Sequence, residues 1–343
     1  MSKNHYIIPI FISHQGCPHQ CVFCNQDRIA KVVNEVTASD VKVTIDEYLE
    51  SIKNKMATIE VSFFGGTFTA ISVDKQKELL GVAREYKEKG LINKIRLSTR
   101  PDAINNYILD YLKEYKVDVI ELGVQSLDEE VLKLSGRGHS VLDVAKASKL
   151  IKDYKITLGH QIMPGLPGDT FEKDIETVKR SIEMKPDLCR IYPSLVIKDT
   201  PMETMYNDGR YTPYSLEDAV YISKEMYKLY KKENIQIIRM GLQPTESITW
   251  GKDIVDGPFH PSFRELVEGS LICENIQNQI GKDDNIILEV NSKDLSKLYA
   301  NKKTYFNKLK ESHNGEIDVT TNNKLKIGKI KLIVVKKIEE III

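Results

Sequence analysis

Three of the five cysteines in the chain lie within eight residues, in the spacing C-x3-C-x2-C. They are Cys17, Cys21 and Cys24, and three thiolates this close can hold a metal ion or a cluster on one loop. A [4Fe–4S] cluster normally takes four cysteines. With three, one iron keeps an open coordination position, at which a ligand or substrate can bind. Phe23, directly before the third cysteine, is placed to shield such a cluster from water.

Zinc is the alternative metal for this loop. A structural zinc site takes four ligands, usually as two separated pairs, and the remaining cysteines, Cys189 and Cys273, are isolated far along the chain. The fourth zinc ligand would then be a histidine, His14 or His19. The ligand spacing favours the cluster, and we expect Cys189 and Cys273 to be small buried apolar side chains.

The composition is that of an ordinary globular protein. The 343 residues leave room for a (β/α) barrel of about 200 to 250 residues and a small further domain. The formal net charge is zero, which gives no support for a strong non-specific polyanion binder. No apolar run approaches the roughly 18 residues of a membrane span, and the N-terminus does not resemble a signal peptide. Clustered cysteines in such a chain indicate a metal site rather than disulfides, so we expect a cytoplasmic protein.

Short apolar runs alternate with longer segments of helical period along the first 240 residues. The expected strands are Tyr6–Ile12, Ile59–Phe64, Lys94–Ser98, Val119–Val124, Ile156–Met163, Leu188–Val196 and Ile235–Met240. The expected helices are Val41–Lys53, Lys75–Lys89, Ile104–Tyr115, Ser140–Asp153, Phe171–Met184 and Leu216–Asn234. Because parallel strands need crossover helices, this order predicts an α/β fold, a partial TIM-like (β/α) barrel. Its functional loops should follow the carboxyl ends of the strands.

The regular alternation of expected strands and helices changes after Gly251. We therefore expect residues 1–250 to form the barrel and residues 251–343 a small C-terminal α/β appendage. Its expected helices are Ser262–Gly281 and Lys293–Lys310, and its expected strands are Ile286–Val290, Ile317–Val319 and Ile330–Lys336. From residue 282 onward there are 13 lysines and 9 acidic residues, a net charge of +4.

Polar and glycine residues follow several of the expected strands. Gly65 and Gly66, with Thr67 next, let the backbone approach a ligand closely. Gln125 ends the fourth strand and can both donate and accept hydrogen bonds. Arg137 follows soon after and carries a fork of donors that matches a carboxylate. Each of these residues alone is more often a turn or capping residue than a ligand.

Taken together, the motifs resemble those of the radical S-adenosylmethionine (SAM) superfamily, and in particular the radical-SAM half of the Elongator catalytic-subunit family. Besides the cysteine loop, the matching segments are Phe63–Phe68, Ser98–Asp102, Glu121–Ser126, Arg137–His139, Ile162–Gly168 and Ile191–Val196. They come in that family's order and cover roughly residues 5–240. Relatives of oxygen-independent coproporphyrinogen oxidase share a looser version. The chain departs from the Elongator pattern in its compact cysteine spacing, and no segment of it resembles an acetyltransferase domain or a basic N-terminal arm.

The resemblance implies the cofactors and their chemistry. Cys17, Cys21 and Cys24 would ligate a [4Fe–4S] cluster whose open iron binds the amino and carboxylate groups of SAM. An electron from a reductant such as flavodoxin or ferredoxin would then cleave SAM to methionine and a 5′-deoxyadenosyl radical. Within this scheme Gly65 and Gly66 would serve the methionine end, Gln125 the ribose and Arg137 the carboxylate of SAM. The full set of cofactor-binding residues is expected to be Phe23, Gly65, Gly66, Thr67, Gln125 and Arg137.

The substrate is less closely defined. By resemblance alone, the favoured substrate is RNA, in particular tRNA. A small metabolite is the second hypothesis, and a non-catalytic iron–sulfur or zinc-binding module is the third; SAM cleavage would separate the enzymes from the module. Tyr192, at a strand end, and His260, between two prolines on a glycine-rich turn, are candidate substrate contacts that could equally be structural.

Overall fold

The computed structural model describes residues 4–12, 17–25 and 35–335, which form two compact units, Met1–Pro261 and Ser262–Ile343. The expected boundary after residue 250 falls inside the first unit. The reason is that the next segment still packs there: β9 (Ile254–Asp256) pairs with β7 (Val196–Ile197), and Phe259 joins a small apolar cluster around β7.

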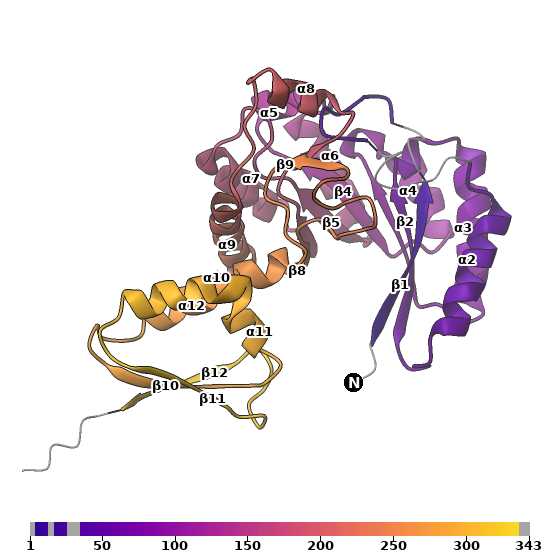
Figure 1. Ribbon diagram of the computed structural model, residues 1–343. Helices are drawn as coiled ribbons and strands as arrows, with labels where there is room; N and C mark the ends of the chain where they lie inside the picture. The colour runs from indigo at the N-terminus through magenta and orange to yellow at the C-terminus, as the bar shows by residue number, and fades with distance from the viewer. Residues whose placement is uncertain (1–3, 13–16, 26–34, 336–343) are drawn as a thin grey trace, which may run out of the picture. The chain divides into compact units, whose positions relative to one another are not determined.

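A curled parallel sheet forms the centre of the first unit (Figure 1). Its strands, in spatial as well as chain order, are β1 (His5–Ile12), β2 (Thr58–Gly65), β3 (Lys94–Thr99), β4 (Val119–Gln125), β5 (Thr157–Ile162), β6 (Leu188–Ile191) and β8 (Gln236–Met240). Among these described strands, β1 and β8 are the two edges, so the sheet is an open barrel. The predicted α/β partial TIM-like fold is confirmed.

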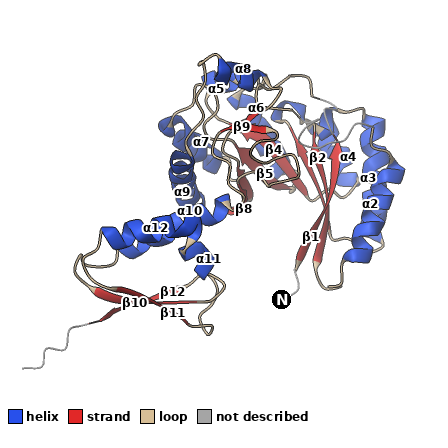
Figure 2. Cartoon of the chain, in the orientation of Figure 1, coloured by secondary structure: helices blue, strands red, loops and turns tan. Residues whose placement is uncertain are grey.

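Helices connect successive strands and cover the outside of the curled sheet (Figure 2). They are α2 (Ala38–Ser51), α3 (Val73–Glu88), α4 (Asn106–Glu114), α6 (Val141–Asp153), α7 (Phe171–Glu183) and α9 (Leu216–Lys232). Local sequence sets their starts: Ser140 caps α6 in a capping box with Asp143, as its position before the helix predicted. The short elements α5 (Glu129–Leu134), α8 (Pro201–Asn207), η1 (Phe68–Ala70) and η2 (Pro101–Ala103) complete the connections.

One expected strand is wrong in extent. Leu188–Val196 is not continuous, because β6 ends at Ile191 and β7 belongs to a separate two-stranded sheet with β9. Pro193 lies between them and has no N–H to donate to a neighbouring strand. The chain therefore leaves the main sheet at Tyr192.

The second unit is a three-stranded sheet with helices packed on its apolar face. Its elements are α10 (Phe263–Gln277), β10 (Asn285–Val290), α11 (Leu295–Leu298), α12 (Ala300–Glu311), β11 (Ile317–Thr321) and β12 (Ile330–Val335). Central β10 runs parallel to β11 and antiparallel to β12. The Lys-rich helix expected over Lys293–Lys310 is divided into α11 and α12, and Asn301, Lys302 and Lys303 have left-handed backbone. In neither unit is a described helix both long enough and apolar enough to cross a membrane.

Candidate active site at the carboxyl ends of the strands

The cysteine loop follows β1 and is fixed by two backbone hydrogen bonds at Val22, directly after Cys21. Val22 donates its N–H to the carbonyl of Ser135 (3.1 Å), and Met202 donates to the carbonyl of Val22 (2.9 Å). Phe23 is half-buried and packs with Val22 on the apolar cluster around Met202. The loop is thus docked on the segments that follow α5 and β7.

The three cysteine side chains differ in exposure. Cys17 is exposed, Cys24 is half-buried, and Cys21 is buried. A turn brings the last two together, because the N–H of Cys24 donates to the carbonyl of Cys21 (3.1 Å). Among the described residues, no three His, Cys, Asp or Glu side chains are gathered as a metal site. Of the two candidate zinc ligands, His14 lies outside the described residues, and the ring of His19 lies where a Cβ on Gly138 would be.

The glycine pair joins the end of β2 to the end of β1. Gly65 has a φ of +107°, and a Cβ there would lie 2.7 Å from the carbonyl oxygen of Ile12. Gly66 donates its N–H to that same oxygen. Only glycine permits this close approach. Next to the pair, the buried side chain of Thr67 places its Oγ1 3.3 Å from the Sγ of Cys17.

Gln125 ends β4 in a conformation rare for its residue type. Its φ is +67°, and the register between β4 and β5 shifts between Gly123 and Gln125. Left-handed backbone in a residue other than glycine costs on the order of 1 kcal/mol or more and is concentrated at functional sites. The buried side chain accepts a hydrogen bond at Oε1 from Nε2 of Gln161 (3.4 Å).

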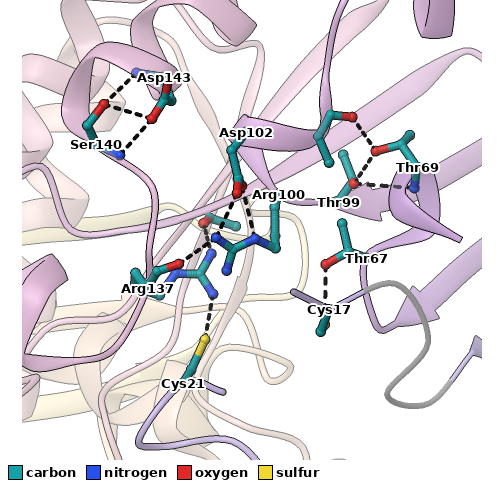
Figure 3. A network of polar contacts seen from close by, with 12 residues as sticks. Cys17, Cys21, Thr67, Thr69, Thr99, Arg100, Asp102, Arg137, Ser140 and Asp143 are labelled. Atoms are coloured by element: carbon teal, nitrogen blue, oxygen red, sulfur yellow. Dashed lines mark hydrogen bonds and ion pairs between the residues drawn. The ribbon is translucent and has the colours of Figure 1, made fainter. Parts of the chain in front are cut away.

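The guanidinium of Arg137 faces the cysteine loop (Figure 3). Its Nη1 donates to the Sγ of Cys21 (3.1 Å), and its Nη2 donates to the carbonyl of Gly123. The side chain is 5% exposed, and within the described part of the chain its Nε has no hydrogen-bond partner. Arg100, itself paired with Asp102 (2.9 Å), donates to the carbonyl of Arg137 and fixes the backbone there.

A row of buried charges crosses the same face of the sheet beneath this site. Arg96 on β3 donates to Glu60 on β2 (3.1 and 3.0 Å) and to Glu121 on β4. Arg190 on β6 donates to Glu121 (3.0 Å) and, through Nη1, to the hydroxyl of Tyr192 (3.0 Å). Burial by itself would raise the pKa of Glu121, but Arg190 and Arg96 bring that pKa below its ordinary value. The row is therefore charged.

Comparison with known proteins identifies the family. Residues 11–180 match the radical SAM superfamily, and residues 186–272 match the radical SAM C-terminal domain. The chain belongs to the radical SAM superfamily. Its relatives include a tRNA uridine(34) acetyltransferase of Methanocaldococcus infernus, 30% identical over 67% of this chain and 51% of that protein. An uncharacterised protein of Methanocaldococcus jannaschii is 33% identical over 63% of this chain and 68% of that protein.

More distant similarity extends to eukaryotes and to solved structures. Elongator complex protein 3 of Homo sapiens is 30% identical over 51% of this chain and 36% of that protein. The chain spans about half the length of the tRNA uridine(34) acetyltransferases it matches. The solved Methanocaldococcus infernus Elp3 with an N-terminal deletion has a TM-score of 0.64 at 25% identity, over 80% of this chain and 64% of that one. The solved structure of Streptococcus suis SuiB bound to S-adenosylmethionine has a TM-score of 0.50 at 18% identity, over 70% of this chain and 51% of that one. At this identity the similarity shows the fold alone.

The structure brings together some of the residues expected in a radical SAM site. Hydrogen-bond contacts join Thr67, which follows β2, to Cys17, and Arg137, which follows α5, to Cys21. Tyr192 lies apart from these contacts and belongs to the row of buried charges. His260 is half-buried on the last segment of the first unit. Cys189 and Cys273 are buried as expected, and burial raises the pKa of each thiol to about 12.

The sequence patterns gave no role to two features of this candidate site. The first is the row of buried charges, whose signal is a charged residue between apolar neighbours in each of four strands. The second is His139, a buried side chain directly after the Arg-Gly pair. Burial, and then the charge of Arg137, lower its pKa to about 3, so this imidazole is neutral.

Proposed function

We propose that this chain binds a [4Fe–4S] cluster through Cys17, Cys21 and Cys24 and uses it to cleave SAM reductively. Three thiols on one loop fit such a cluster, because soft thiolate ligands select iron–sulfur clusters and zinc over hard metal ions. The observation that carries the proposal is the hydrogen bonding of the cysteine sulfurs: Cys21 accepts from Arg137 at 3.1 Å, and Cys17 contacts Thr67 at 3.3 Å. Hydrogen bonds to the sulfurs are a feature of protein iron–sulfur sites.

When bound, the cluster supplies the electron that breaks the sulfonium of SAM, giving methionine and a 5′-deoxyadenosyl radical. The backbone at Gly65 and Gly66 leaves room for the methionine end, since both residues lack a Cβ. Gln125, held in its left-handed conformation, presents an amide for the ribose hydroxyls. The resemblance also assigns the SAM carboxylate to Arg137, although two of its nitrogens already donate to Cys21 and Gly123.

We further propose that the substrate is RNA, in particular tRNA, and that the protein acts in the cytoplasm with a reductant such as flavodoxin or ferredoxin. Support comes from the relatives named as tRNA uridine(34) acetyltransferases, of which this chain spans about half. A small metabolite is the alternative substrate. Mass spectrometry of tRNA from a deletion strain distinguishes the two, because only the RNA hypothesis predicts the loss of a modified nucleoside.

Anaerobic reconstitution tests the cofactor assignment. The wild-type protein should hold roughly four irons and four sulfides per chain and, with a strong reductant, release 5′-deoxyadenosine from SAM. Cys24→Ala should lose both properties. Cys273→Ala is the matched control, since it removes a thiol buried in the second unit and should retain the cluster. A single tightly bound zinc in the wild type, or a stable cluster in Cys24→Ala, would refute the assignment.

A further inference from the structure

We propose that Arg137 and Thr67 are hydrogen-bond donors to the sulfur atoms of the cluster ligands Cys21 and Cys17, and that they set the reduction potential of the cluster. This inference rests on the proposed function, since it presupposes a cluster on the three cysteines. It departs from the resemblance at Arg137, which the family pattern assigns to the SAM carboxylate. Thr67 follows β2 and Arg137 follows α5, 50 and 116 residues along the chain from the cysteines they contact, so only the fold brings them to the sulfurs (Figure 3).

Arg137 is held in place for this role. Its Nη2 donates to the carbonyl of Gly123, and its own carbonyl accepts from Arg100. A Cβ on Gly123 would lie 3.2 Å from Nη2, so a larger residue there would crowd the guanidinium. With one nitrogen fixed on β4 and the side chain 95% buried, Nη1 points at the Sγ of Cys21 (3.1 Å). Turning toward another anion would break two hydrogen bonds inside the protein.

Thr67 is buried, and its backbone is fixed. Its carbonyl accepts from the N–H of Ala70 (3.0 Å), and the residue is 1% exposed. Between a hydroxyl and a thiol, either atom can donate. A cysteine that ligates iron is a thiolate and has no proton, so in the loaded protein the Thr67 hydroxyl must be the donor to the Cys17 sulfur.

The direction of the effect follows from charge. One-electron reduction adds a negative charge to the cluster, and hydrogen bonds to its sulfurs stabilise the more negative state. Both donors therefore raise the reduction potential. Arg137 brings a full positive charge into a buried site where screening is weak, whereas Thr67 brings only a hydroxyl dipole. The contribution of Arg137 should be the larger of the two.

The test is a redox titration of the reconstituted protein in the absence of SAM, with the reduced cluster followed by electron paramagnetic resonance. At a fixed ambient potential, Arg137→Met should lower the ratio of reduced to oxidised cluster at least tenfold, which for one electron is a shift of 59 mV. Arg137→Lys, which keeps the charge, should lower the ratio of reduced to oxidised cluster less than Arg137→Met does. Thr67→Val should lower the ratio about threefold, and Thr67→Ser should restore it. Arg84→Met, which removes an equal charge from the surface helix α3, is the control and should leave the ratio unchanged.

SAM affinity is measured on the same variants by equilibrium dialysis. A wild-type potential in Arg137→Met together with weakened SAM binding overturns the proposal and returns Arg137 to the SAM carboxylate. If Arg137→Met loses its iron, the Thr67 pair decides: a shift in Thr67→Val that serine reverses supports the proposal, and a wild-type potential in Thr67→Val overturns it. Absence of any cluster from the wild type refutes the proposed function itself, which is a different result.

Discussion

Removing the charge of Glu121 should destabilise the first unit more than removing the charge of Glu60, the other carboxylate in the row of buried charges. Glu121 is 2% exposed and accepts hydrogen bonds from both Arg96 and Arg190. Glu121→Gln keeps the volume but leaves Arg190, 7% exposed, with the Tyr192 hydroxyl and the face of the Phe64 ring at 5.4 Å. Removing one partner of a buried ion pair costs about 3–5 kcal/mol, because the other charge stays buried without compensation.

Two further variants turn this magnitude into a rank order. Glu60→Gln should cost less, about 1–3 kcal/mol, because Arg96 keeps its bond to Glu121. Asp153→Asn breaks an exposed pair with Lys149 on α6 and should cost about 0.2–1 kcal/mol. The expected order of destabilisation is therefore Glu121→Gln, Glu60→Gln, Asp153→Asn.

Urea unfolding followed by tryptophan fluorescence is the suitable assay. The chain has a single tryptophan, Trp250, which lies in the first unit and packs edge-on against Phe259. Its signal reports that unit and leaves out the second, which can unfold separately. A loss below about 1 kcal/mol in Glu121→Gln, or a loss no larger than that of Glu60→Gln, would refute the view that Glu121 compensates two buried charges.

Three further predictions concern single residues. Tyr192→Phe tests the expectation from the sequence that Tyr192 contacts the substrate. A substrate contact predicts a loss of substrate turnover of about 2- to 12-fold, the value of one hydrogen bond, with SAM cleavage in the absence of substrate unchanged, and the ratio of modified product to 5′-deoxyadenosine measures this loss. Gly65→Ala forces a Cβ to within 2.7 Å of the Ile12 oxygen at a positive φ, so urea unfolding should show a loss of about 1–3 kcal/mol. Burial raises the pKa of Asp169 from 3.8 to about 6, and that of its neighbour Asp174 well above its ordinary value. The contribution of Asp169 to the free energy of unfolding should therefore be largest below about pH 3.8 and should fall by up to about 3 kcal/mol as the pH rises to about 6. Urea unfolding at several pH values should show a smaller pH dependence in Asp169→Asn than in the wild type.

The order of strands and helices in the first unit was predictable because each element carries its own period and its own caps. Ser140 before α6 and Thr170 before α7 are N-cap residues, which fix where those helices begin through local hydrogen bonds alone. The end of β6 was missed because most residues from Leu188 to Val196 are apolar. Pro193 in that run was the signal that the strand stops.

The contacts of the site were less predictable than the elements. Residue type marked Arg137 as an anion ligand, but the partner of a guanidinium depends on what the fold places beside it. Here the fold places the Cys21 sulfur within 3.1 Å. The row of buried charges had a sequence signal in its spacing, but the pairing of Arg96 with both Glu60 and Glu121 depends on strand register, which no local pattern fixes.

Strand β4 links the stability of the barrel to the geometry of the site. Glu121 and Gly123 are two residues apart and therefore face the same side of the sheet. Glu121 holds the row of buried charges, while Gly123 gives Arg137 both a carbonyl and the space for its guanidinium. A change that shifts β4 would move Arg137 relative to Cys21 even if no residue of the cysteine loop were altered. Destabilising variants in the row should consequently disturb the cysteine site before they unfold the protein.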